Sequence, residues 1–134
     1  MMTTVFTTDS ATVSWNEKAK AVHVEFNTFV HSQELRDICD KAMELQEQKG
    51  AQRMISDNRK LTVISQEDQQ WISTVHNQRI QDSGIKFVAI VLPEKTIGKI
   101  SMKRVVASSV AFDDIQTVFE SFESVEEAED WLNS

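Results

Sequence analysis

The residues best suited to chemistry gather in one polar stretch, DNRKLTVISQED, at positions 57 to 68. It holds three acids, two bases and a serine within twelve residues. Aspartate and asparagine at its start suit a tight turn, because their short side chains hydrogen-bond to nearby backbone. The alternative is a surface that binds an anionic ligand or a protein partner. The candidate residues for that surface are Asp57, Asn58, Arg59, Ser65, Glu67 and Asp68.

Two of these side chains have competing roles. Arg59 can hold an anionic group, or it can form an ion pair with Glu67 or Asp68. Ser65 is followed three residues later by Asp68, which is the capping-box pattern and predicts a helix that starts near Gln66. As an N-cap, the serine hydroxyl would accept backbone N–H groups, so a structural role is favoured over phosphorylation.

A lysine repeat is the second candidate surface. Lys95, Lys99 and Lys103 recur every four residues beside an apolar stripe that runs to residue 110, which predicts one basic ridge along a helix. Such a ridge is usually a solvated helix face. It can instead meet an acidic partner or anionic lipid headgroups, with a ligand held between this helix and a sheet.

Catalytic residue types are scattered along the chain. His23, His31 and His76 have no metal-ligand spacing with one another or with Cys39. Each is expected to be a surface or partly buried histidine, and Cys39 is expected to pack as a small hydrophobe on a helix. No dinucleotide-binding, P-loop or serine-hydrolase motif occurs in the sequence. We therefore expect no catalytic set, no metal site and no cofactor.

The elements that position these residues follow from hydrophobic periodicity and from helix caps. A hairpin is expected over 10–26, and strand 85–92, a continuous apolar run, is expected in the middle of a sheet. The second helix is expected to bury Trp71, Ile72, Val75 and Ile80. The remaining expected elements are helices over 31–50, 66–84, 96–110 and 124–132, and strands over 51–57 and 115–122.

This order, ββαβαβαβα, predicts an α/β fold with about five strands and about four helices. Its sheet would be mixed and mostly parallel, with the hairpin at an antiparallel edge. An edge strand of the hairpin can pair with a second copy of the chain, or charges such as Lys18, Lys20 and Glu25 can protect it, so a homo-oligomer stays open.

Length and composition limit the class of protein. The 134 residues suit a single domain over 1–134, and 40% hydrophobic with 26% charged residues is typical of a folded chain. A net charge of −7 argues against nucleic acid as the main partner. No export signal or membrane-spanning run is visible in the sequence, so we expect a cytoplasmic protein without a transmembrane segment.

A family resemblance rests on SDNRKLTVISQEDQQW (56–71) before the second helix and GIKFVAIVLP (84–93) after it. Their order and spacing resemble STAS domains, typified by anti-sigma-factor antagonists, and more closely the SpoIIAA-like relatives. That superfamily includes CRAL-TRIO lipid-binding domains. The resemblance spans roughly residues 12 to 132, lies in order and spacing more than in identical residues, and implies a SpoIIAA-like fold.

The resemblance also implies where a regulatory switch would lie. Asp57 matches an aspartate that ends a strand in the antagonists, whose Asp-Ser-Ser-Gly motif then aligns with Ser65, Gln66, Glu67 and Asp68. The phosphorylated serine of the family is replaced by Glu67, a fixed negative charge. The implied function is a non-catalytic regulatory or protein-interaction module without the switch serine.

Two alternatives stay open beside that module. The first is a small carrier that binds an apolar or anionic, lipid-like ligand between the 96–110 helix and the sheet, near Arg59 and Lys99. The second is acid–base chemistry by Asp57 or His76, although no residue pattern selects a reaction.

Overall fold

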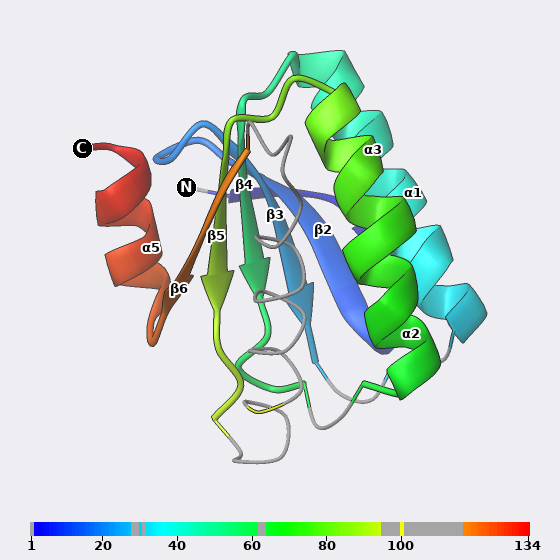
Figure 1. Ribbon diagram of the computed structural model, residues 1–134. Helices are drawn as coiled ribbons and strands as arrows, with labels where there is room; N and C mark the ends of the chain where they lie inside the picture. The colour runs from blue at the N-terminus through cyan, green and yellow to red at the C-terminus, as the bar shows by residue number, and fades with distance from the viewer. Residues whose placement is uncertain (1, 28–29, 31, 62–63, 95–99, 101–116) are drawn as a thin grey trace.

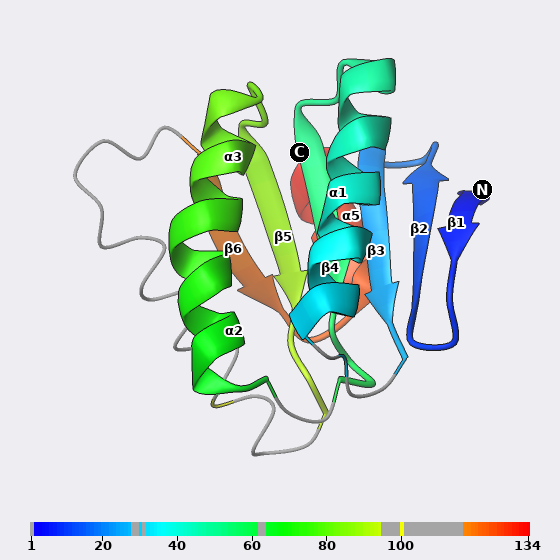
Figure 2. The same ribbon diagram turned by 90° about the vertical axis from the view of Figure 1, so that its right-hand side faces the viewer.

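One six-stranded sheet organises the computed structural model, which describes residues 2–27, 30, 32–61, 64–94, 100 and 117–134. The strands lie in sequence order from one edge to the other, as Figure 2 shows. The first three are antiparallel neighbours, and the last four pair in parallel. They are β1 (Met2–Thr7), β2 (Ala11–Asn16), β3 (Ala21–Phe26), β4 (Arg53–Asp57), β5 (Phe87–Val91) and β6 (Val118–Phe122).

Helices cover both faces of this sheet (Figure 1). On one face lie α1 (Ser32–Lys49) and a second long helix, and on the other lies α5 (Val125–Leu132). The second helix runs without a break through α2 (Gln66–Trp71), η1 (Ile72–His76) and α3 (Asn77–Asp82), and we call it the α2–α3 helix. Crossovers of this kind are what allow strands to pair in parallel.

The two faces carry cores of different size, because successive strand residues point to opposite sides. On β4, Met54 packs in the larger cluster, under α1 and the α2–α3 helix, whereas Ile55 packs in the smaller one. The smaller cluster includes Ala128 and Leu132 of α5. The larger cluster also contains every buried side chain of α1 that is apolar, from Leu35 to Leu45.

The α/β class and the mixed sheet are confirmed, but the strand count is wrong. Residues 2–7 add β1 beyond the hairpin, so β1 and not a hairpin strand forms that edge. This stretch lacks a buried face: only Phe6 is partly covered, and the strand is held by pairing with β2. β5 has a neighbouring strand on each side, but it lies next to the β6 edge and not in the middle of the sheet as expected. The helix expected over 96–110 lies outside the described residues, apart from Ile100.

Local signals placed the described helices well. Ser65 and Ser124 are N-caps whose side chains accept the backbone N–H of Asp68 and of Glu127. Gly50 and Gly84 follow the ends of α1 and of the α2–α3 helix with φ values of 60° and 91°, a region that glycine adopts without strain. The predicted role of Val75 is wrong, because its side chain is 52% exposed.

A π-helical turn explains the error at Val75. In η1 the backbone N–H of Asn77 donates to the carbonyl of Ile72, five residues back instead of four. The extra residue rotates Val75 outward and turns His76 and Asn77 toward the sheet. Both of these side chains contribute to the site described next.

Candidate functional site

The polar residues predicted to form a binding surface at the end of β4, which we call the β4 corner, mostly bond to other groups of the protein. Asp57 accepts two hydrogen bonds from the guanidinium of Arg59, from Nε at 3.0 Å and from Nη2 at 2.8 Å, and a third from the Arg59 backbone N–H. The hydrogen bonds to Asp57 raise the pKa of Arg59 above its usual value. Arg59 therefore forms an ion pair, but the predicted partners, Glu67 and Asp68, are wrong. Its guanidinium is already occupied by a carboxylate and is poorly placed to hold another anion.

The other residues of the β4 corner differ in burial and in hydrogen bonding. Asn58 is fully buried, and its backbone N–H donates to the carbonyl of Val91. Ser65 is committed to its cap. Asp68 is only 2% exposed, and its Oδ1 has no hydrogen-bond partner within the described part of the chain. Glu67 alone of the predicted acids faces solvent.

Lys95, Lys99 and Lys103 lie outside the described residues, so the basic ridge and the ligand site beneath it stay predictions.

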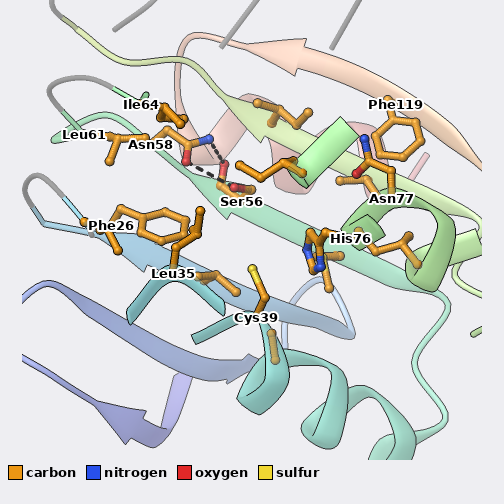
Figure 3. Close-up of a pocket in the computed structure, with 18 residues that line it drawn as sticks. Phe26, Leu35, Cys39, Ser56, Asn58, Leu61, Ile64, His76, Asn77 and Phe119 are labelled. Atoms are coloured by element: carbon orange, nitrogen blue, oxygen red, sulfur yellow. Dashed lines mark hydrogen bonds between the residues drawn. The ribbon is translucent and has the colours of Figure 1, made fainter. Parts of the chain in front are cut away.

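A different site lies on the inner side of the same crossover. Between α1, the α2–α3 helix and the sheet is a cavity of about 80 Å³, shown in Figure 3. Asn58, Leu61 and Ile64 close one end of it, at the carboxyl ends of the parallel strands. Its walls are mainly apolar and include Phe26 of β3, Leu35 and Ala42 of α1, and Val88 and Ile90 of β5. Protein interiors contain few voids larger than a water molecule, so this cavity is a departure from ordinary packing.

His76 is the most unusual side chain in the cavity wall. Its ring stacks on Trp71 with centroids 5.7 Å apart, and Arg36 lies over the same indole. Nδ1 of His76 is buried and has no hydrogen-bond partner among the described residues. Burial, helped by the nearby positive charge of Arg79, lowers the pKa of His76 to about 4. The imidazole is therefore neutral at neutral pH.

Cys39 lines the cavity beside His76 in Figure 3 but is not an activated nucleophile. Burial raises the pKa of the Cys39 thiol to about 12. A thiol, not a thiolate, is present at neutral pH, and the thiol is the unreactive form. The prediction that Cys39 packs as a small hydrophobe agrees with its place in the larger core.

His23 is more deeply buried than the surface or partly buried position that was expected. On the opposite face of the sheet, it is 1% exposed, with Nδ1 3.2 Å from Nδ2 of Asn16. The Asn16 amide is oriented by the backbone N–H of Ala19, which it accepts, and by Glu129, to which it donates. Burial is the main cause that lowers the pKa of His23. The group helps to attach α5 to the β2–β3 turn and is separate from the cavity.

Sequence reasoning missed the cavity although one signal for it was present. Ile72, His76 and Ile80 are spaced by four residues, which places the histidine on the buried stripe of a helix. The cavity itself depends on three elements that meet only in the folded chain. No single stretch of sequence reports the space left between them.

Other site types find no support within the described ranges. They contain no group of three or more His, Cys, Asp or Glu side chains placed to hold a metal ion. Within the same ranges, no helix combines the length and apolar composition that crossing a bilayer requires. Comparison of the chain with protein-family models, curated proteins and solved structures found no match. The resemblance to STAS domains stays a prediction from element order.

Proposed function

We propose that this domain is a non-catalytic module that binds a small apolar molecule between the sheet, α1 and the α2–α3 helix. The observation that carries the proposal is the apolar cavity of about 80 Å³. At about 24 cal/mol per Å³, a void of this size, left empty, costs about 2 kcal/mol of stability. A ligand that fills it recovers much of that cost, which gives binding a physical driving force.

The chemistry of the lining supports binding over catalysis. The cavity places a protonated thiol and a neutral imidazole among aliphatic side chains. The proposal retains the idea, left open by the sequence, of a carrier for a lipid-like ligand, but it changes the place and the size of the ligand. The site is under α1 and the α2–α3 helix, and its small volume suits a short chain.

A protein partner at the crossover between β4 and α2 is the second candidate function. One observation favours it: Asn58, Leu61 and Ile64 line the cavity, while Lys60 and Glu67 of the same crossover are exposed. An occupant of the cavity would contact the inner side of a segment whose exposed residues Lys60 and Glu67 can meet a partner. The ligand would then be the signal of a regulatory module.

Matched valine substitutions test the primary proposal. Val24→Ile and Val88→Ile each add a methyl group to the cavity, whereas Val13→Ile and Val22→Ile add one elsewhere in the same core. We expect the cavity variants to keep their stability but to lose most of the thermal stabilisation produced by 1-chlorohexane. The control variants should lose about 1 to 3 kcal/mol by overpacking and keep the ligand effect.

Native mass spectrometry of protein purified without detergent gives an independent measurement, in which a bound small molecule is expected as added mass. Equal loss of the probe effect in both pairs of variants would show that binding is not at the cavity. The absence of any stabilisation across linear probes of four to eight carbons would overturn the proposed function.

A further inference from the structure

The polar side chains that line the cavity differ in how fully they are hydrogen-bonded. At one end, Ser56 Oγ donates to Asn58 Oδ1 at 3.2 Å, and Asn58 Nδ2 donates to the Ser56 carbonyl at 3.1 Å. These two side chains, joined by dashed lines in Figure 3, complete each other's hydrogen bonds. Nδ1 of His76, farther along the cavity, has no such partner in the described part of the chain. A buried polar atom without a hydrogen bond destabilises the folded protein.

The cavity wall is also uncharged in the part of the chain that the structure describes. No Asp, Glu, Lys or Arg side chain is among its described lining residues. Arg79, whose positive charge helps to lower the pKa of His76, hydrogen-bonds to Asp40 at 2.6 Å, and both of these side chains are exposed. A carboxylate or phosphate moved into this environment would lose its hydration without gaining a counter-charge, which is strongly unfavourable.

We propose that the ligand is a neutral molecule with a slender hydrocarbon body and one hydroxyl-like head that hydrogen-bonds to Nδ1 of His76. This inference rests on the proposed function and names the chemical class that the site accepts. It selects against the anionic ligands that the sequence left open. A hydroxyl both donates and accepts, so it can pair with Nδ1 in either tautomer of the neutral ring.

Volume sets the shape of the body. The cavity has about 80 Å³ and is only partly enclosed. A linear alkyl chain can enter such a space by one end and extend beyond it, whereas a ring must fit inside at its full width. The stacked pair of His76 and Trp71 gives the head-group atom a fixed position, because the π-turn and the indole restrain the imidazole.

Three six-carbon probes of equal length test the head group: 1-hexanol, 1-chlorohexane and hexanoate, measured by calorimetry at pH 7.5. We expect 1-hexanol to bind roughly 3- to 10-fold more tightly than 1-chlorohexane, the effect of one net hydrogen bond. Hexanoate should bind at least roughly 10-fold more weakly than 1-hexanol, because its charge must be desolvated. The His76→Phe variant keeps an aromatic ring beside Trp71 but lacks Nδ1. It should bind 1-hexanol more weakly than 1-chlorohexane, because the buried hydroxyl then has no hydrogen-bond partner.

A measurement on the unaltered protein makes the test independent of how well that variant folds. The ¹⁵N chemical shift of His76 Nδ1 should move when 1-hexanol is added and stay in place with 1-chlorohexane. If both alkyl probes bind equally and the shift does not move, the head-group inference is overturned, and water is the natural partner of Nδ1. Tight binding of hexanoate would overturn it as well. Failure of all three probes to bind would instead overturn the proposed function.

Discussion

At the scale of single residues, burial separates side chains that the sequence makes look alike. Asp57, Glu67 and Asp68 are all acids in one polar stretch, yet only Glu67 is exposed. The Asp57 side chain is 2% exposed and pairs with Arg59, whose side chain remains 38% exposed. The sequence predicted that these residues lie in or next to a tight turn that carries charged side chains. It could not predict which charge is neutralised, because that depends on the direction in which each side chain leaves the backbone.

The asymmetry of this pair leads to a ranking of two substitutions. Arg59→Met leaves the buried Asp57 carboxylate without its guanidinium, so we expect the free energy of unfolding to fall by about 2 to 3 kcal/mol. Solvent screening of the exposed arginine places this value below that of a fully buried pair. Asp57→Asn leaves an arginine that can reach water, and should cost only about 1 kcal/mol.

Urea unfolding at pH 7 measures both changes. Glu67→Gln, at an exposed position in the same crossover, is the control and should stay within about 0.5 kcal/mol of the original protein. A larger loss for Asp57→Asn than for Arg59→Met would contradict the ranking. It would mean that the arginine, not the aspartate, depends on the pair.

At the scale of elements, features encoded by a few neighbouring residues could be predicted from the sequence, whereas features that depend on packing could not. The caps at Ser65 and Ser124 were found because each is encoded within four residues. The π-turn at η1 was missed because a periodic apolar pattern assumes four-residue hydrogen bonding throughout. β1 was missed because its three apolar residues, Met2, Val5 and Phe6, show no alternation. The cavity was missed because its walls come from separate elements.

The crossover between β4 and α2 carries the prediction that belongs to this scale. If its outer side meets a protein partner, a photo-crosslinking residue at position 67 should yield a crosslinked product in native extract. The same residue at position 74, exposed on the α2–α3 helix, is the matched control and should not. Saturation of the cavity with 1-hexanol should change the yield at position 67, because the crossover lines the cavity.

Competition makes this result specific. Excess protein without the crosslinker should suppress the product, and excess Glu67→Lys should not, because the reversed charge weakens the contact. Identical products at positions 67 and 74, or suppression by both competitors, would count against a partner at the crossover.

At the scale of the whole molecule, the order of strands predicts a gradient of local stability. β4 lies between β3 and β5, and its side chains pack in both cores. Among the described strands β1 pairs only with β2, and its side chains are exposed except for the partly covered Phe6. Regions with few buried contacts open locally at a small fraction of the global free energy. Amide hydrogen exchange should therefore be slowest in β4 and much faster in β1.

The same measurement addresses the oligomeric state that the sequence left open. An unpaired edge such as β1 presents backbone groups to which another strand can add. If β1 amides exchange as slowly as those of β4, the gradient is wrong for the isolated chain, and something covers the edge. Repeating the exchange at tenfold lower protein concentration then shows whether a second copy of the chain protects the β1 amides. Protection that falls on dilution in β1, with β4 unchanged, assigns it to a second copy of the chain, because only an intermolecular contact depends on concentration.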